Sequence, residues 1–177
     1  HGQIRRQRQM CIRDSAVAYS DKNELSGKYL NTTRENFLKT LNISAYSLTE
    51  MVRMLSPKMN DGASIMALTY YGSTRYMQSY NVMGVAKAAL ETSIKYLAVD
   101  MGDRGIRVNA ISAGPMRTLA GAVINKSRKI YNYTIENSPI KKPLSLEDIG
   151  KSSVYLMSDL SKGVTGEILY VDNGYNN

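Results

Sequence analysis

The sequence predicts an α/β protein built on an open, doubly wound parallel sheet. From Ser15 onward, helical patterns alternate with short apolar runs, as expected for a sheet covered by helices on both faces. Each intervening helix is also long enough to cross between parallel strands. The 177 residues are 43% hydrophobic and 21% charged, the composition of an ordinary globular domain. We therefore expect a single domain over residues 15–177.

Two long helices are predicted in the first part of the chain. Thr32, with Glu35 three residues later, forms a capping-box pattern, and apolar residues then recur at helical spacing until Pro57. A second helix is predicted over residues 81–101, ending at Gly102 as its C-terminal cap. Both helices have the length that a parallel crossover requires.

Three short apolar runs bounded by turn residues are predicted to be buried parallel strands: 63–69, 106–112 and 167–172. Between the last two strands, a long polar segment runs to Lys142, and Ser145 with Asp148 then opens another helix. Ligands of such sheets bind outside the C-terminal ends of the strands. Residues 69–72 and 113–118 should therefore lie together along one functional edge.

Composition excludes several classes of protein. Cys11 and His1 are the single cysteine and histidine, so neither a disulfide framework nor a zinc site is expected, and metal catalysis is not predicted. No apolar stretch approaches the roughly 20 residues that cross a bilayer, so we expect a cytoplasmic protein without a membrane partner.

The basic opening segment, residues 1–14, shows neither a helical nor a strand period and reads like a translated vector or adapter junction. The alternative is a basic arm for nucleic acid, but no interleaved aromatic residue or binding motif supports it. We therefore predict a non-native segment and no nucleic-acid partner. No glycine-rich phosphate loop of the G-x-G-x-x-G kind precedes the predicted strands, so the chain is expected to be the C-terminal part of a longer domain.

Tyr80 and Lys87 form the most suggestive chemical pair. Seven residues correspond to almost two helical turns, which places both side chains on one helix face. A lysine ammonium near a phenol favours the phenolate and makes the tyrosine a better proton donor or oxyanion stabiliser near neutral pH. The spacing alone is weak evidence, because a tyrosine on a helix face is usually a packing residue.

Three motifs supply the context: Leu-Thr-Tyr-Tyr-Gly at 68–72, Tyr-Asn-Val-Met-Gly-Val-Ala-Lys at 80–87, and Arg-Val-Asn-Ala-Ile-Ser-Ala-Gly-Pro at 107–115. In this order and at these intervals, they resemble the enoyl-acyl-carrier-protein reductases of the short-chain dehydrogenase/reductase superfamily. The resemblance covers residues 15–177, with 15–19 similar to the end of the family's fourth strand. It implies the C-terminal part of a Rossmann-like domain and an oxidoreductase of fatty acid biosynthesis that uses NADH, with NADPH not excluded.

The resemblance also implies roles for individual residues. Tyr80 would stabilise the enolate oxygen, Lys87 would hold the nicotinamide ribose and tune Tyr80, and Tyr70 would contact the acyl substrate. The remaining cofactor-binding residues would be Gly114, Pro115, Met116 and Thr118. Met83 and the apolar residues of the polar segment would line the acyl pocket beneath a lid, namely Ala120, Ile124 and Ile130. The alternatives without a functional role are that Tyr70 only packs at the sheet edge, that Pro115 only ends its strand and that the lid residues form a short surface helix.

Ala67 distinguishes an enoyl reductase from a ketone-reducing member of the superfamily. Classical ketone-reducing members of the superfamily carry a serine about thirteen residues before the catalytic tyrosine, and this chain has Ala67 there. A 3-ketoacyl reductase or another short-chain dehydrogenase is therefore the alternative. An inactive fragment and an interaction-only homologue remain further readings. The expected donor is an enoyl thioester of the acidic acyl carrier protein, which the basic residues of the lid would attract, and the family suggests a homotetramer.

Overall fold

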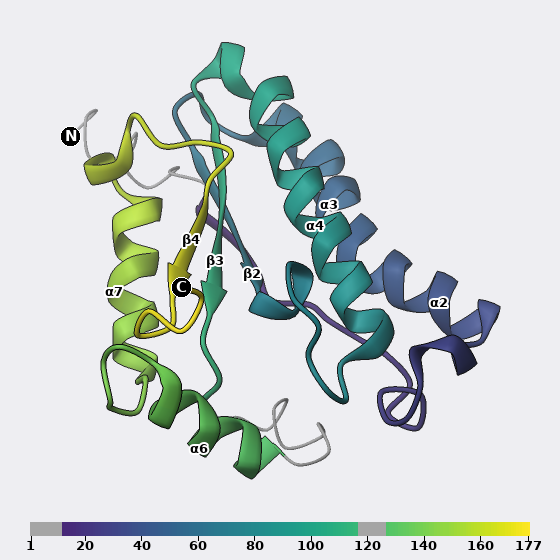
Figure 1. The fold of residues 1–177 in the computed structure, drawn as a ribbon. Helices are drawn as coiled ribbons and strands as arrows, with labels where there is room; N and C mark the ends of the chain where they lie inside the picture. The colour runs from purple at the N-terminus through teal and green to yellow at the C-terminus, as the bar shows by residue number, and fades with distance from the viewer. Residues whose placement is uncertain (1–11, 117–126) are drawn as a thin grey trace.

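Four parallel strands form one sheet in the computed structural model, which describes residues 12–116 and 127–177. The strand order follows the chain: β1 Ile12–Ser15, β2 Ser64–Thr69, β3 Arg107–Ala113 and β4 Ile168–Val171. Helices lie on both faces of the sheet (Figure 1). The predicted parallel, Rossmann-like α/β fold is therefore confirmed.

The first strand begins earlier than the sequence predicted. Ile12 pairs with Ser64 and Ser15 pairs with Ala67, so residues 12–14 belong to the sheet rather than to a segment outside the domain. A strand of four residues is too short to show a convincing period of two, and its place is decided by pairing with β2. Residues 16–19, expected at the strand end, follow it as a loop. Whether residues 1–11 are native stays a prediction, because they lie outside the described residues.

The first long helix is α2 Arg34–Leu41, which continues through a π-helical segment, Asn42–Tyr46, into α3 Ser47–Leu55. Its cap is Thr33 and not Thr32 as the capping-box pattern predicted. The Thr33 hydroxyl accepts a 3.2 Å hydrogen bond from the Asn36 amide. The Glu24 carboxylate in turn accepts bonds from both the amide and the hydroxyl of Thr33, at 2.9 and 2.8 Å. A residue outside the helix thus selects which threonine caps it.

The second long helix, α4 Asn81–Asp100, was predicted to within one residue. Its end differs from the prediction because Gly102 begins a short 3-10 helix, Gly102–Arg104, and the left-handed turn falls at Gly105, with φ 62°. After β3 come α6 Ser127–Asn137 and α7 Leu146–Met157. The predicted capping box of Ser145 and Asp148 is present at the start of α7.

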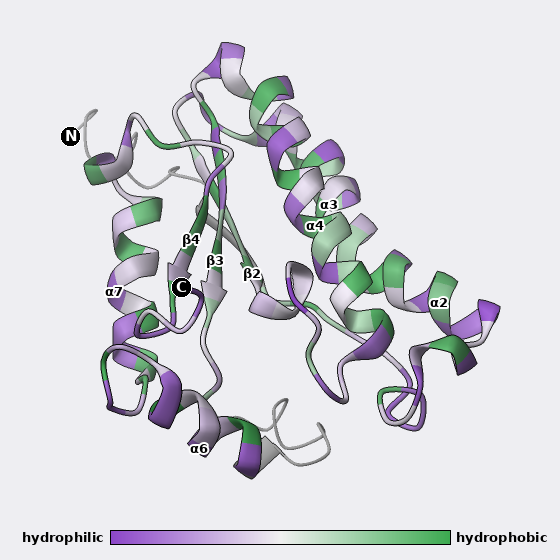
Figure 2. Cartoon of the chain, in the orientation of Figure 1, coloured by the Kyte–Doolittle hydropathy of each residue, from purple (hydrophilic) through white to green (hydrophobic). Residues whose placement is uncertain are grey.

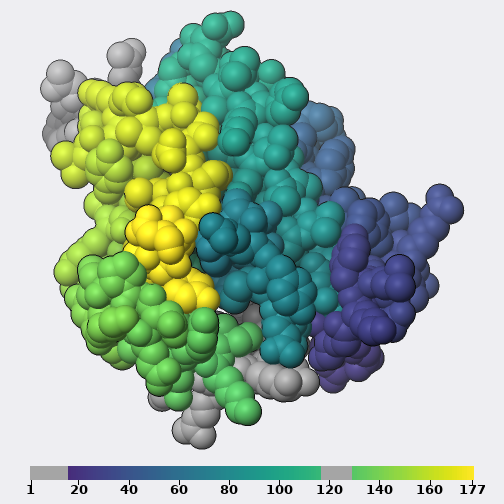
Figure 3. All heavy atoms as spheres, in the orientation of Figure 1, coloured from purple at the N-terminus to yellow at the C-terminus, as the bar shows by residue number. Residues whose placement is uncertain are grey.

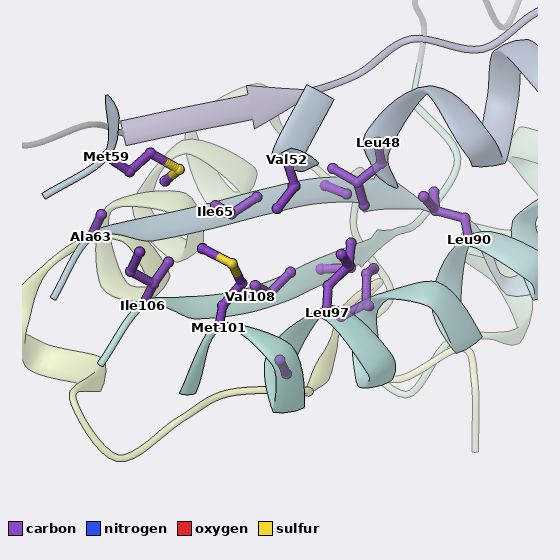
Figure 4. Close-up of a cluster of buried hydrophobic side chains, with 14 of the residues drawn as sticks. Leu48, Val52, Met59, Ala63, Ile65, Leu90, Leu97, Met101, Ile106 and Val108 are labelled. Carbon is purple, nitrogen blue, oxygen red and sulfur yellow. The ribbon is translucent and has the colours of Figure 1, made fainter. Parts of the chain in front are cut away.

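The larger part of the core lies between the sheet and the layer of α2, α3 and α4. Leu48 and Val52 of α3 and Leu90 of α4 pack against Ile65 and Val108 of the two central strands (Figure 4). Their exposed fractions are 3% or less. Burial of such side chains stabilises a fold by about 1.5–3 kcal/mol each. This cluster holds α4 rigidly against the strands that lead to the predicted site.

The opposite face is covered by α7, whose Ile149 and Leu156 pack on Met66 and Ile111. Figure 2 shows the alternation of hydrophilic and hydrophobic residues along α7, as expected for a helix with one buried side. Helix α6 is more hydrophilic and lies across the C-terminal ends of the strands (Figures 1 and 2). Among the helices of the described residues, none combines the length and the apolar character needed to cross a membrane.

Candidate active site

Tyr80 stands at the start of α4 in an unusual stretch of backbone. The residues on either side of it, Ser79 and Asn81, both have positive φ values, 61° and 37°. Such values are uncommon for residues other than glycine and cluster at functional sites. They turn the chain sharply into the helix and direct the Tyr80 ring inward, where the residue is 9% exposed. The backbone is thus shaped to place this one side chain.

Tyr70, which directly follows β2, lies against Tyr80. The two rings meet edge to face, with centroids 5.0 Å apart and an interplanar angle of 70°. Met83 belongs to the same small apolar cluster, together with Leu25 and Ala86. The structure therefore brings together Tyr70, Tyr80 and Met83, which the sequence analysis had assigned to a single site.

Lys87 points from α4 toward the end of β2. Its ammonium donates a 2.8 Å hydrogen bond to the carbonyl of Leu68, two residues before Tyr70, and the residue is 7% exposed. Burial lowers the pKa of Lys87 from 10.5 to about 8, and the negative charge of Glu91 opposes this change. One of the three ammonium protons is engaged by the Leu68 bond, which leaves donors for a ligand.

The pKa of Tyr80 moves in the direction opposite to that expected from the sequence. Burial raises it above the ordinary value of 10.0, and the nearby Tyr70 and Glu91 raise it further. Burial likewise raises the pKa of Tyr70, with a smaller contribution from Tyr175. The expectation failed because the Lys87 ammonium is directed at the Leu68 carbonyl while Tyr80 sits in an apolar cluster. At neutral pH, Tyr80 is therefore a phenol that can donate a hydrogen bond.

Two glycines allow the loop after β2 to approach α4. A Cβ added to Gly72 would lie 2.5 Å from Cδ1 of Tyr80, and one added to Gly84 would lie 2.7 Å from the carbonyl oxygen of Gly72. Real Cβ atoms essentially never come so close to another heavy atom. Gly72 and Gly84 therefore set the contact between this loop and the helix that carries the tyrosine and the lysine.

Leu25 is a site residue that the sequence analysis missed. It is 7% exposed and packs beside Tyr80 and Met83. Its loop is fixed by the Asn81 amide, which donates to the carbonyl of Glu24 at 2.9 Å, and by the Glu24 carboxylate bonds at the start of α2. No local pattern around Leu25 indicates this position, because the contacts span more than fifty residues of sequence.

At the end of β3, the predicted cofactor residues Gly114 and Pro115 line a small cavity with Thr134 and Ser138 of the α6 region. A Cβ on Gly114 would lie 2.9 Å from Cα of Asp172, so glycine permits a close approach to the end of β4. The next residue, Met116, packs on the apolar cluster beneath α7. These residues follow β3, at the same edge of the sheet where Tyr70 follows β2.

Thr118, Ala120 and Ile124 lie outside the described residues. Ile130 is half-buried on α6, where its carbonyl accepts the Thr134 hydroxyl. The C-terminal residues lie between α6 and the loop after β2 (Figure 3), and the Tyr175 ring meets that of Tyr71 at a centroid distance of 5.6 Å. The described part of the predicted lid thus stands beside the functional edge.

A groove of about 480 Å³ lies between the start of α4 and the loop after β2. Tyr80, Asn81 and Gly84 line it from α4, and Gly72, Arg75 and Met77 line it from the loop after β2. Met83 is not among its lining residues and packs instead with Leu25. Tyr80 and Met77 border both this groove and the apolar cluster of Met83.

Three polar side chains beneath the site were also missed. Thr69 and Ser112 form a register pair at the ends of β2 and β3. The Thr69 hydroxyl donates a 2.7 Å hydrogen bond to the buried carboxylate of Glu91. The Ser112 hydroxyl is buried without a hydrogen-bond partner among the described residues. Ala67, by contrast, is fully buried in the apolar core, where no polar group is available to a substrate.

The parallel sheet and the tyrosine and lysine at its C-terminal edge define a Rossmann-like protein of the short-chain dehydrogenase/reductase class. Residues 12–176 match the family model described as enoyl-(acyl carrier protein) reductase, and the chain belongs to that family. Within the described residues, no group of three or more potential metal ligands occurs.

Curated relatives carry the same family name. The chain is 57% identical over 161 residues to "Enoyl-[acyl-carrier-protein] reductase [NADH] 2" of Rhizobium meliloti, covering 91% of this chain and 60% of that protein. It is 48% identical over 159 residues to the FabI reductase of Bacillus subtilis, covering 90% and 62%. The chain thus spans about 60% of the length of the curated relatives it matches.

Solved structures agree on the fold. FabI from Candidatus Liberibacter asiaticus is 52% identical, with a TM-score of 0.91, and the match covers 99% of this chain and 69% of that one. The Anaplasma phagocytophilum reductase in complex with NAD is 48% identical, with a TM-score of 0.90, and the match covers 97% and 65%. The site described above therefore lies in a fold shared with these reductases.

Proposed function

We propose that this chain provides the active site of an NADH-dependent enoyl-acyl-carrier-protein reductase, which reduces the alkene of a trans-2-enoyl thioester. The observation that carries the proposal is the convergence of Tyr70, Tyr80 and Lys87 at the C-terminal edge of β2. The names of the relatives support both the reaction and NADH as cofactor.

Tyr80 has the properties of a hydrogen-bond donor to the thioester carbonyl. Its pKa is raised by burial, so the phenol keeps its proton at neutral pH. A bound NADH would supply the hydride to the distal alkene carbon, and negative charge would then develop on the carbonyl oxygen. A donor fixed by the backbone on either side of Tyr80 stabilises that charge more in the transition state than in the ground state. Tyr70 would position the acyl group against Tyr80.

The residues at the edge fit a nicotinamide cofactor. The Lys87 ammonium retains donors suited to ribose hydroxyls, and the orphaned Ser112 hydroxyl lies on the neighbouring strand. Gly114, Pro115, Met116 and Thr118 would hold the nicotinamide and the pyrophosphate. The unpaired Ser112 hydroxyl independently supports a ligand at this edge, because a buried polar group is usually hydrogen-bonded to protein, water or ligand.

The acyl chain would be held by the apolar cluster and the lid, with Met83, Ala120, Ile124 and Ile130 in contact with it. Figure 1 places α6 beside the strand ends, where a lid must lie. The basic residues of this region would attract the acidic acyl carrier protein: Lys126, Arg128, Lys129, Lys141 and Lys142. Reversing the charge of Lys129 and Lys141 should then raise KM for carrier-protein substrates at low salt while leaving KM for a short thioester unchanged.

A 3-ketoacyl reductase is the second candidate, and Ala67 argues against it. This position carries no hydroxyl that could polarise a ketone, and its side chain is fully buried between the sheet and α4. At the end of β2, the Thr69 hydroxyl is bonded to Glu91, and the phenol that follows the strand is that of Tyr70. The site therefore favours a conjugated alkene over a ketone.

The direct experiment uses a fusion of residues 12–177 to the N-terminal portion that precedes the matched region in the Rhizobium meliloti relative. NADH oxidation is followed with crotonyl and acetoacetyl thioesters, and NADPH is tested in parallel. We expect preferential reduction of the crotonyl compound with NADH. Preferential reduction of the acetoacetyl compound would support the ketoreductase, and absence of both activities in a folded fusion would leave the non-catalytic homologue.

We also propose a homotetramer in the cytoplasm. Large apolar residues stand exposed on the outer side of the helical layer, including Met54 of α3 and Tyr96 and Val99 of α4, at 63%, 72% and 79% exposure. A second copy of the chain would cover this surface, since helical layers commonly associate isologously. Light scattering of the fusion should show four protomers, and Tyr96→Lys with Val99→Lys should shift it to smaller species.

A further inference from the structure

Lys87 and Glu91 hold two consecutive residues at the end of β2. Lys87 donates to the carbonyl of Leu68 at 2.8 Å, and Glu91 accepts from the hydroxyl of Thr69 at 2.7 Å. The following residue in the chain is Tyr70. One turn of α4 therefore fixes, through a cation and a carboxylate, the strand end from which the substrate-contacting tyrosine extends.

The two charged residues are also electrostatic neighbours. Residues four apart on a helix share one face, with Cβ atoms about 5–6 Å apart. Glu91 is 9% exposed and Lys87 is 7% exposed, so solvent screens their attraction only weakly. Glu91 is the charged group that counteracts the effect of burial on Lys87.

The other elements packed around Lys87 bring no second counter-charge within the described residues. The strand β3 presents Ala110 and Ser112 to α4, and the titratable groups at the site mouth are the neutral phenols of Tyr70 and Tyr80. The buried residues of the α2–α3 layer are uncharged: Asn36, Thr40, Ser44, Ala45, Leu48 and Val52. Arg107 bonds to groups of the opposite, α7 face.

We propose that Glu91 is a positioning residue for the reductase site: its buried carboxylate fixes the end of β2 through Thr69 and keeps the Lys87 ammonium charged. The proposal rests on the proposed function, because a charged Lys87 serves to hold the cofactor ribose. Thr69 orients the carboxylate, and its hydrogen bond leaves the second carboxylate oxygen with further capacity to act on the lysine.

The decisive substitution is Glu91→Gln, which keeps the shape of the side chain and an oxygen able to accept the Thr69 hydrogen bond while it removes the charge. The titration of Lys87 is followed by NMR of the 177-residue protein labelled at the lysine side chains, with Lys87→Met to assign the signal. We expect Glu91→Gln to move the Lys87 midpoint below that of the unsubstituted protein by about one pH unit. Glu91→Asp, which retains the charge, should restore much of the difference.

The matched control is Asp100→Asn, which removes an exposed carboxylate from the end of the same helix and should leave the Lys87 midpoint unchanged. An unchanged midpoint in Glu91→Gln would overturn the proposal, as would an equal shift in Asp100→Asn. If Glu91→Gln fails to fold, Thr69→Val provides the second test. Loss of the orienting hydroxyl should also shift the Lys87 midpoint, and a midpoint identical to that of the unsubstituted protein would contradict the proposed arrangement.

In the fusion enzyme, Glu91→Gln should move the alkaline limb of the kcat/KM profile for NADH to lower pH, because Lys87 loses its proton earlier. At pH 8, KM for NADH should rise about fivefold, because the protonated fraction of Lys87 falls from about one half to about one tenth, while kcat at saturating NADH changes little. A purely structural role would instead lower the active fraction without moving the profile. Failure of the fusion to reduce any enoyl thioester would count against the proposed function, whereas the NMR titration tests the role of Glu91 independently.

Discussion

Two cations are buried on opposite faces of the sheet, and the structure treats them differently. Arg107, at the start of β3, donates to the carbonyls of Leu156 and Ser158 and to the hydroxyl of Ser161, at 2.7, 3.0 and 2.7 Å. Lys87, beside the end of β2, has a hydrogen bond to Leu68. Both residues are less than 10% exposed.

The comparison separates stabilisation from function. Arg107 satisfies several buried acceptors at the end of α7, at the N-terminal edge of the sheet, where ligands of this fold do not bind. Lys87 keeps spare donors at the opposite edge, and burial holds its pKa at about 8. Burial lowers the pKa of both cations, so the lowered pKa does not separate them; the place of Lys87 at the ligand-binding edge of the sheet does.

Replacing each cation by methionine should give the largest difference in stability between the two sites. Arg107→Met removes three hydrogen bonds from a buried guanidinium and should lower the free energy of unfolding by about 2–3 kcal/mol, since the carbonyls of Leu156 and Ser158 keep donors from Ser64 and Ser161. Lys87→Met removes the Leu68 hydrogen bond and the counter-charge of Glu91, but it also removes a charge whose burial is unfavourable, so the loss should be smaller, about 1 kcal/mol near pH 7. Urea unfolding of both variants measures this contrast. Equal losses would show that Lys87 has the same structural role as Arg107.

The pH dependence of stability gives the second contrast. The pKa of Lys87 is about 8 in the folded protein and 10.5 ordinarily, so between these values the unfolded chain binds more protons. Raising the pH through this window therefore stabilises the folded protein. The unfolding free energy of the unsubstituted protein, minus that of Lys87→Met, should rise by about 2–3 kcal/mol from pH 8 to 10.5. A flat difference would mean that Lys87 is not titrating at a lowered pKa.

Adding a methyl group should destabilise the protein at the closely packed functional edge but not on the outer side of α7. Gly84→Ala forces a Cβ against the carbonyl of Gly72 and should cost about 1–3 kcal/mol. Its control is Gly150→Ala on α7, where a Cβ would meet no atom within 4 Å and should stabilise the helix by about 0.5–1 kcal/mol. Thermal unfolding of the two variants compares them, and Tm changes of the same sign would contradict the geometry.

The smallest effect concerns the start of α2. Thr33→Ala should cost about 1 kcal/mol, because Thr33 caps the helix and bonds to Glu24. Thr32→Ala should be nearly neutral, because the buried Thr32 hydroxyl has no hydrogen-bond partner in the part of the chain that the structure describes. Chemical denaturation of the pair distinguishes the two caps. A larger loss for Thr32→Ala would restore the cap predicted from the sequence.

The sequence predicted most of the fold and the tyrosine–lysine pair because periodicity and motif spacing are local signals. The strand of residues 12–15 escaped prediction because its place depends on pairing with β2. The cap at Thr33 depends on Glu24, and Leu25 reaches Tyr80 through a loop held by Asn81. Glu91 reads as an ordinary helix glutamate until the fold places it beneath Thr69. Residues defined by contacts distant in sequence are therefore the ones that sequence reasoning misses.

The central claim, that Tyr80 stabilises the developing enolate, is tested most directly by the turnover of crotonyl thioester with NADH in the fusion enzyme carrying Tyr80→Phe. Tyr76→Phe is the control, since that tyrosine is 82% exposed nearby. We predict a loss in kcat of about 100- to 1000-fold for Tyr80→Phe, with the unsubstituted rate retained by Tyr76→Phe. Unimpaired kcat in a folded Tyr80→Phe enzyme would contradict the assignment.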